Sequence, residues 1–390
     1  MNKLGIVSGL ALMLAVLATN AQAQDSATDS TAEKQTNTEE LRQQIVAKGL
    51  KYFSEKGQAE NGSFTEKAGA GITALAVTSA LRNGLSVDDP MVAKGLEALN
   101  GFVKPDGGIY GGGRLKNYET CVAVVALSLA NDSGKYNKTL ANAQAFLKGL
   151  QVDGADRKPD DPWYGGVGYG GSGRPDLSNT AYFVEALIAT GADEDDESIQ
   201  RAITFISRCQ NLEGHGNDTR FADLVKDGGF YYSIPTESSD ASSETERITA
   251  NGGLRSYGSM TYSGFKSMIY AGLTKENPRV EAATTWIENT YSVEKNPGMG
   301  TAGLFYYFHT FSSALNAAGM EKVVDKDGEA HDWRADLITQ LAELQNDDGS
   351  WTNEDRRWFE NDPNLSTGFA LLALSYCKPA AETPATDAGK

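Results

Sequence analysis

The chain has 390 residues, with 35 Lys and Arg against 52 Asp and Glu, and a formal net charge of −17. Its 40% hydrophobic content excludes wholesale disorder, because such a chain can bury a sizeable core. The acidic balance excludes a nucleic-acid partner, which needs clustered Lys and Arg, and opposes binding to anionic lipid.

The first residues predict a secretory signal peptide over 1–23. Met1-Asn2-Lys3 is a positive start, Leu4 to Leu17 is apolar, and Ala21-Gln22-Ala23 has the small-x-small form of a cleavage site. The apolar run is shorter than the ~20 residues that a spanning helix needs. We therefore expect a periplasmic or extracellular protein with no integral membrane segment after cleavage.

Residues 24–40 follow as a polar segment whose only apolar residues are Ala, which predicts a disordered tether. Residues 378–390 have a similar composition and predict a disordered tail. The folded domain is expected to span 41–377.

Six segments within this domain have the single apolar stripe of an amphipathic helix. Asp89-Pro90 and Asn277-Pro278 mark two of the starts, each with a capping residue followed by Pro at the first helical position. The stripes span residues 41–53, 92–102, 140–150, 199–206, 280–287 and 333–344.

Six further segments alternate with these and are apolar or small nearly all round, which is typical of helices buried on every side. Each has a Thr near its start: Thr73, Thr120, Thr180, Thr261, Thr310 and Thr367.

This alternation predicts an all-α fold, an (α/α)6 toroid with the buried helices as the inner ring and the amphipathic helices as the outer ring. Gly-aromatic loops such as Asp348-Gly349-Ser350-Trp351 join each outer helix to its inner partner. The connection over 212–257 is too long for a plain turn, and its Phe230 to Ile234 run predicts a small β-hairpin there.

Three cysteines, Cys121, Cys209 and Cys377, are far apart and are expected to be buried hydrophobes rather than a disulfide framework. With three His in the whole chain, a Cys/His zinc site has few ligands to use. We expect no metal and no other cofactor.

The stretch Leu344 to Trp351, LQNDDGSW, resembles the glutamine-tryptophan repeat of squalene–hopene cyclases. Leu150-Gln151 and Cys209-Gln210 end outer helices in the same way. The pattern covers nearly all of 41–377, so the chain resembles the prenyltransferase and squalene-cyclase repeat superfamily. The resemblance implies that these Gln and Trp residues are structural braces.

The acid motif of squalene–hopene cyclases, Asp-x-Asp-Asp-Thr, aligns with Asp176-Leu177-Ser178-Asn179-Thr180. In that family the central Asp protonates the polyene, and here Ser178 stands in its place. A Ser hydroxyl is far too weak an acid to protonate an alkene. The cyclase mechanism therefore lacks its proton source.

Protein prenyltransferases use a zinc held by an Asp-x-Cys-Tyr-Ser/Thr motif and by a later His-Thr. The matching stretches here are Tyr257-Gly258-Ser259-Met260-Thr261 and His309-Thr310. Of the three zinc ligands, only the His is kept, as His309. One imidazole with a Tyr and a Ser cannot hold Zn²⁺ as three committed ligands do.

In such toroids the N-termini of the inner helices meet at one mouth, where their free N–H groups favour an anion or a carboxylate. Asp176, His309 and Glu119 are the candidate catalytic residues there, although acids just before a helix also serve as simple caps. The candidate cavity residues are Tyr118, Glu119, Asp176, Asn179, Tyr257, Ser259, Tyr262, Lys266, Tyr306, His309 and Asp362.

Lys266 is unusual because it lies in a buried helix. It either projects a cation into the cavity, pairs with Glu185, or reaches solvent with its long stem. His309 follows an aromatic run, Phe305 to Phe308, whose ring faces would suit an apolar or sugar-like ligand.

Three functions follow. The first is a secreted protein that binds an apolar, isoprenoid-like or glycan ligand, with the acid and zinc chemistry of the family lost. The second is an isoprenoid-modifying enzyme of the terpene cyclase or prenyltransferase type that reuses Asp176 and His309. The third is an extracellular polysaccharide lyase or hydrolase, in which paired carboxylates must face each other across the cavity.

Overall fold

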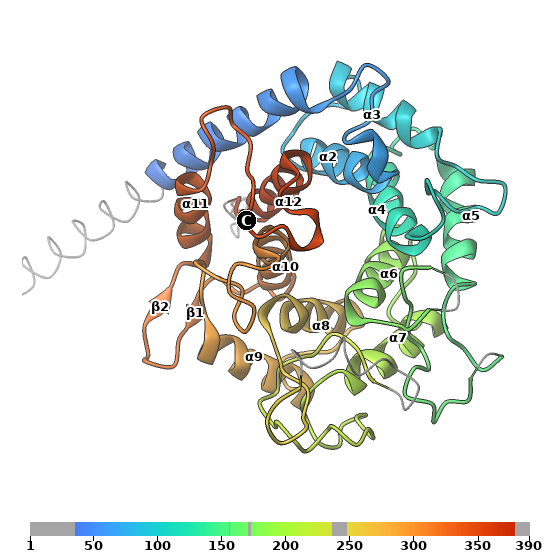
Figure 1. Cartoon of the computed structure of the whole chain (residues 1–390), viewed down its shortest axis with the longest axis vertical. Helices are drawn as coiled ribbons and strands as arrows, with labels where there is room; N and C mark the ends of the chain where they lie inside the picture. The colour runs from blue at the N-terminus through green and yellow to red at the C-terminus, as the bar shows by residue number, and fades with distance from the viewer. Residues whose placement is uncertain (1–35, 156, 171–172, 236–247, 379–390) are drawn as a thin grey trace, which may run out of the picture.

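The computed structural model describes residues 36–155, 157–170, 173–235 and 248–378. The predicted signal peptide, most of the predicted tether and nearly all of the predicted tail lie outside these residues. The described chain forms two concentric rings of helices around a common axis (Figure 1).

The inner ring is closed. Each inner helix packs against the next one, and α12 packs against α2. The predicted toroid is therefore confirmed. The inner helices are α2 (Gly71–Arg82), α4 (Lys116–Leu129), α6 (Leu177–Ala189), α8 (Gly258–Tyr270), α10 (Leu304–Ala317) and α12 (Pro363–Tyr376).

The outer ring consists of a helix over 36–52 followed by α3 (Pro90–Asn100), α5 (Asn137–Lys148), α7 (Glu197–Arg208), α9 (Pro278–Thr290) and α11 (Trp333–Glu343). The predicted caps are confirmed, since Asp89 accepts the N–H of Met91 and Asn277 accepts the N–H of Arg279. The first helix begins N-terminal to the predicted domain start at residue 41.

The repeated Thr residues tie the loops to the inner helices. In five repeats the Thr hydroxyl oxygen accepts a backbone N–H from the preceding Gly-aromatic loop, at 3.0 to 3.1 Å. The donor–acceptor pairs are Phe64–Thr73, Ile109–Thr120, Val167–Thr180, Phe230–Thr261 and Trp351–Thr367. Thr310 differs, because its hydroxyl donates to the Tyr307 carbonyl at 2.9 Å.

Glutamines at the ends of four outer helices brace the outer ring. Each side-chain amide donates to the carbonyl of a loop Gly and to a carbonyl in the next outer helix, at 2.8 to 3.0 Å. The bridged helix carbonyls belong to Met91 for Gln58, Ser198 for Gln151, Arg279 for Gln210 and Ile45 for Gln345. The last of these bonds closes the ring between α11 and the first helix.

The N-terminal ends of the inner helices lie at one mouth, as predicted. The Glu119 carboxylate in the first turn of α4 accepts the N–H of Ala70, the residue before α2, at 2.8 Å. The Glu360 carboxylate before α12 accepts the N–H of Tyr306 in the first turn of α10 at 2.8 Å. Such bonds between neighbouring first turns require parallel inner helices.

The predicted hairpin near 212–257 is wrong for the described part of that segment, which holds turns and isolated bridges. The backbone carbonyls of the Phe230 run instead accept hydrogen bonds from residues at the starts of inner helices. The Tyr232 carbonyl accepts the N–H of Leu177 and the Phe230 carbonyl accepts the N–H of Tyr257. Beyond these bonds the run forms a single antiparallel bridge, between Phe230 and Gln210, and no strand.

The described residues do contain one β-hairpin, where β1 (Val323–Val324) pairs antiparallel with β2 (Ala330–His331). It projects from the outside of the toroid between α10 and α11 (Figure 1).

Cys121, Cys209 and Cys377 are free and buried, as expected. None of the helices in the described part of the chain combines the length and the apolar character that crossing a bilayer requires.

Candidate ligand-binding site

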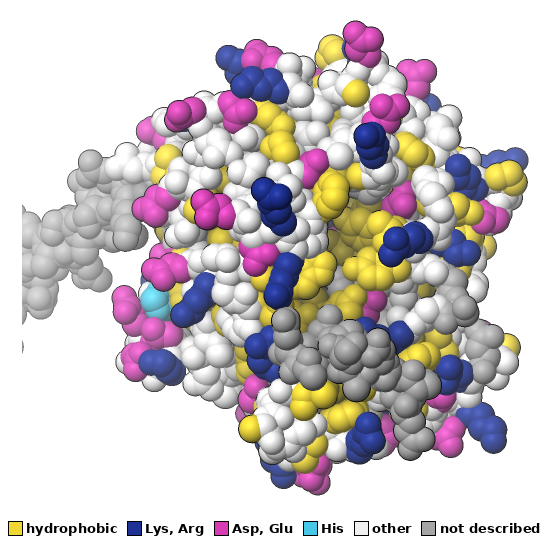
Figure 2. Space-filling view, in the orientation of Figure 1, with side chains coloured by type: hydrophobic (Ala, Val, Ile, Leu, Met, Phe, Trp, Pro, Cys, Tyr) yellow, Lys and Arg dark blue, Asp and Glu magenta, His cyan; other side chains and the backbone are white. Residues whose placement is uncertain are grey.

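The centre of the toroid is hollowed on the face shown in Figure 2, and hydrophobic side chains line the hollow. Four aromatic residues from α4, α6, α10 and α12 form a connected row, which we call the aromatic belt: Tyr118, Tyr182, Tyr306 and Phe369. Successive ring centroids are 5.2, 6.1 and 5.6 Å apart. Since α8 separates α6 from α10 in the ring, the contact of Tyr182 with Tyr306 spans the interior.

Ser178, at the position that the resemblance assigns to the cyclase acid, lies against this belt. Its Oγ is 2.7 Å from the hydroxyl oxygen of Tyr306, which is also 3.4 Å from Ser263 Oγ. Ser178 and Tyr306 are both half-buried, consistent with a position at the wall of the hollow. At this position the chain therefore offers a neutral hydroxyl pair.

Asp176 is the N-cap of α6 rather than a free acid in the hollow. Its carboxylate accepts the backbone N–H of Asn179 at 2.8 Å and the Asn179 side-chain amide at 2.9 Å. Burial raises the pKa of Asp176 to about 6, and the bonds from Asn179 partly oppose that shift. Asp176 and Asn179 are both buried and hold each other.

Replacing Asp176 with Asn is expected to change the pH dependence of stability. The raised pKa means that the folded state holds a proton where the unfolded carboxyl, near 3.8, has lost it. The contribution of Asp176 to the free energy of unfolding is therefore fully present below pH 4 and is lost as the pH rises through about 6. Asn keeps an acceptor oxygen without the charge. In urea unfolding, the free energy of unfolding of the variant relative to that of the parent should therefore rise by about 2–3 kcal/mol from pH 4 to pH 8.

Asp347→Asn is the matched control because Asp347 is exposed, and its profile should run parallel to that of the parent. A parallel profile for Asp176→Asn as well would contradict the assigned cause.

The two other acids at the mouth also serve the backbone. Glu119 lies within the first turn of α4 and accepts the N–H groups of Ala70 and Gly111, both at 2.8 Å. Asp362 caps α12 through Asn364 and Leu365. Asp362 is therefore a helix cap, as expected for an acid just before a helix. Glu119 instead stabilises the start of the neighbouring helix α2.

Glu360 is a structural acid that the sequence did not single out. It is 1% exposed and accepts the N–H of Tyr306 and the side-chain amide of Asn353. It supplies the cap that α10 lacks, because the residue before α10 is Gly303.

Three other predicted cavity residues pack away from the hollow or into the rim. Tyr257 precedes α8 and is buried, and Ser259 is held by Asn296, whose side-chain amide donates to its Oγ at 3.2 Å. Tyr262 was predicted wrongly: its ring packs on Tyr307 and Phe311, at 5.8 and 5.1 Å. Phe311 in turn contacts Trp333 of α11, so this cluster lies between the rings.

Lys266 forms a buried ion pair with Glu185, at 2.8 Å between Nζ and Oε2. The two side chains are 5% and 10% exposed. Although burial opposes both charges, each partner holds the other ionised, so the pKa of Glu185 falls to about 2 and that of Lys266 rises. The sequence alternative of a pair with Glu185 is therefore confirmed.

His309 lies close to this pair and is buried. Its ring stacks on Phe369 at 5.8 Å, and its Nδ1 has no hydrogen-bond partner. Burial and the nearby Lys266 lower the pKa of His309 to about 3, so the imidazole is neutral at physiological pH. It can accept or donate a hydrogen bond but carries no charge.

His309, Glu185 and Tyr182 line a narrow cavity with Arg82 and Tyr376, two residues at the carbonyl ends of α2 and α12. The cavity has about 300 Å³ of unfilled space, including space open to solvent. The sequence missed Arg82 and Tyr376 because a basic or aromatic residue in the last turn of a helix is ordinary. Glu185 carried a signal, as the only charge in an apolar helix.

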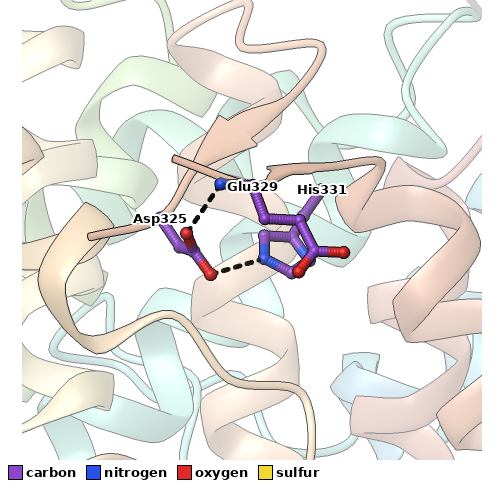
Figure 3. Close-up of side chains that lie close together, drawn as sticks. All are labelled: Asp325, Glu329 and His331. Atoms are coloured by element: carbon purple, nitrogen blue, oxygen red, sulfur yellow. Dashed lines mark hydrogen bonds and ion pairs between the residues drawn. The ribbon is translucent and has the colours of Figure 1, made fainter. Parts of the chain in front are cut away.

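A different group of side chains lies on the outer hairpin (Figure 3). Asp325 Oδ2 is 3.0 Å from Nε2 of His331, and Glu329 donates its backbone N–H to Asp325 Oδ1 at 2.9 Å. Within the described ranges, Asp325, Glu329 and His331 are the only His, Cys, Asp or Glu group close enough to share a metal ion. The Asp325 bonds close the turn between β1 and β2.

A closed ring of parallel inner helices inside a ring of outer helices, braced by Gln side chains, defines the α/α toroid class. Residues 46–233 match the family model of the squalene–hopene cyclase C-terminal domain, which is just under half of the chain. The family match over 46–233, together with the shared fold, supports a toroid of the squalene–hopene cyclase and prenyltransferase-like superfamily.

Solved structures with this fold include two forms of the type II terpene cyclase MstE from Scytonema. One, bound to its substrate geranylgeranyl dihydroxybenzoate, is 15% identical with a TM-score of 0.50. The other, an apo form, is 14% identical with a TM-score of 0.51. Each match covers 88% of this chain and 98% of that chain, and at this identity it shows the fold alone. No curated protein matches the sequence significantly.

Proposed function

We propose that this chain binds an apolar, isoprenoid-like ligand in the central hollow and does not cyclise it by protonation. The observation that carries the proposal is the aromatic belt, in which Tyr118 and Tyr306 are partly exposed. Stacked and edge-on ring faces give an extended apolar wall, and such walls bind hydrocarbon chains through burial of apolar area. The toroid relative that holds a geranylgeranyl compound supports the ligand class.

The absence of cyclisation rests on the acid. Protonating an alkene needs a strong, poised general acid, and Ser178 offers a hydroxyl bonded to a second hydroxyl. The nearest carboxyl in sequence, Asp176, is held by the backbone and side chain of Asn179.

The alternative enzymes receive little support from the same contacts. Reuse of Asp176 and His309 by an isoprenoid enzyme would join a capping carboxylate on α6 to a neutral imidazole on α10. A glycan hydrolase needs two opposed carboxylates. Here Glu119, Asp176 and Asp362 each accept a backbone N–H with one carboxylate oxygen.

Secretion remains part of the proposal. The apolar segment and cleavage site over 1–23 predict export. A protein with an apolar hollow at its centre is suited to holding an isoprenoid in an aqueous compartment, where the free ligand would aggregate.

The test is a pair of measurements on the purified full chain. Isothermal titration calorimetry with geranylgeraniol should show saturable binding, and Tyr306→Ala should weaken it about 10-fold or more, because the substitution removes a belt ring. Tyr110→Ala is the matched control, since Tyr110 stacks on Phe146 of the outer helix α5 and should leave binding unchanged.

Gas chromatography and mass spectrometry of squalene and geranylgeraniol recovered from the protein should show only the starting compounds. Cyclised product above the level of heat-denatured protein would refute the loss of chemistry. No binding by either ligand would refute the proposed function itself.

A further inference from the structure

The cavity next to the aromatic belt contains three buried polar atoms that have no hydrogen-bond partner. They are Nε of Arg82, the hydroxyl of Tyr182 and Nδ1 of His309. They come from α2, α6 and α10, and Tyr182 and His309 are 9% and 4% exposed. Buried polar groups in native proteins are nearly always paired, so three convergent unpaired atoms indicate a missing ligand group.

The charges around this cavity do not balance. Arg82 and Lys266 are cations, Glu185 is the only anion on the cavity wall, and His309 is neutral. Lys266 forms its ion pair with Glu185, at 2.8 Å between Nζ and Oε2. The Arg82 guanidinium instead lies over the Tyr376 ring, 4.9 Å from the ring centroid. The carbonyl end of α2 offsets part of the Arg82 charge but leaves its Nε–H without an acceptor.

The cavity adjoins the belt, because Tyr182 belongs to both and His309 contacts a belt residue. Tyr182 lines the cavity and contacts Tyr118 and Tyr306 with its ring. His309 lines the cavity and stacks on Phe369. A molecule with its polar end at Arg82 would therefore have its apolar body against the belt.

We propose that this cavity binds the carboxylate head of a monoanionic apolar ligand, an isoprenoid or similar carboxylic acid, with Arg82 as the charged contact and Tyr182 and His309 as hydrogen-bond partners. The inference rests on the proposed function, because it places the tail in the same hollow. Two cations share the single anion Glu185, and this excess of one positive charge in a narrow cavity fits one carboxylate. A diphosphate would bring at least two negative charges against an excess of one positive charge.

The experiment compares two probes with the same chain, geranylgeranoic acid and geranylgeraniol, by isothermal titration calorimetry at pH 8. The acid should bind the parent protein about 10- to 100-fold more tightly than the alcohol, the range expected for a charge-assisted hydrogen bond in a buried site. Arg82→Gln should remove that preference by weakening the binding of the acid. Arg82→Lys should restore part of it.

Lys275→Gln is the matched control. Lys275 is an exposed cation in the loop that follows α8, at the same end of the toroid, and its loss should leave the preference intact. Equal binding of acid and alcohol by the parent protein would overturn the head-group site while keeping the proposed function. Binding of neither probe would overturn the proposed function. A loss of preference in Lys275→Gln equal to that in Arg82→Gln would reduce the effect to general electrostatics and also overturn the site.

Discussion

Replacing Glu185 with Leu should destabilise the protein by about 3–5 kcal/mol, because it leaves Lys266 buried without its anion. Arg82 would then be a second cation near the same cavity with no carboxylate to offset it. Lys266→Met should cost somewhat less, since Arg82 still attracts Glu185. The measurement is urea unfolding followed by circular dichroism.

The double variant Glu185→Leu/Lys266→Met is the decisive comparison. It should recover most of the lost stability, because a buried pair replaced by apolar groups of similar volume leaves no charge unpaired. The exposed pair Lys51 and Glu55, 3.8 Å apart, is the matched control, and Glu55→Leu should cost less than about 1 kcal/mol.

In the parent protein the contribution of the pair should be constant from pH 5 to pH 8. The pKa of Glu185 is lowered to about 2, so the pair's contribution is present above the unfolded value of 4.5 and is lost only as the pH falls toward 2. A double variant as unstable as Glu185→Leu would show that the pair itself is not the cause.

The fold could be predicted because its chemistry repeats. Thr near the start of each inner helix, Gly-aromatic loops and Asp-Pro or Asn-Pro helix starts are local signals. The bonds from Phe64 to Thr73 and from Trp351 to Thr367 show why the Thr recurs. The predicted hairpin near 212–257 was wrong for the described residues, because the Phe230 carbonyl accepts the N–H of Tyr257 at the far end of that segment.

The candidate site could be predicted only in part, because its residues meet across the ring. Sequence placed Tyr118, Tyr306 and His309 on inner helices, and the belt and cavity contain them. Helix periodicity cannot tell which side of a fully buried helix faces the centre, so Tyr262 was assigned to the wrong side. The expected anion site at the N-terminal mouth was already occupied by the acids of the chain itself.

Replacing Gly165 with Ala should be among the most damaging additions of a single methyl group. Gly165 has a φ of +86°, and a Cβ there would lie 1.8 Å from the carbonyl oxygen of Arg201 in α7. The Gly165 carbonyl also accepts the brace bond from Gln151 at 2.9 Å, so the loop cannot move without breaking that bond. Strain and backbone clash together predict a loss of about 3–5 kcal/mol in urea unfolding.

Two other glycines separate these causes. Gly191 has a φ of +88° with nothing within 4 Å of a Cβ, so Gly191→Ala should cost about 1–2 kcal/mol, the strain alone. Gly112 also has open space, and its φ lies outside the left-handed region, so Gly112→Ala should be nearly neutral. The excess of Gly165→Ala over Gly191→Ala measures how closely neighbouring outer helices approach at the Gln151 brace. Equal costs at the two positions would mean that α7 can withdraw from the loop, and that the brace does not fix the spacing of the outer ring.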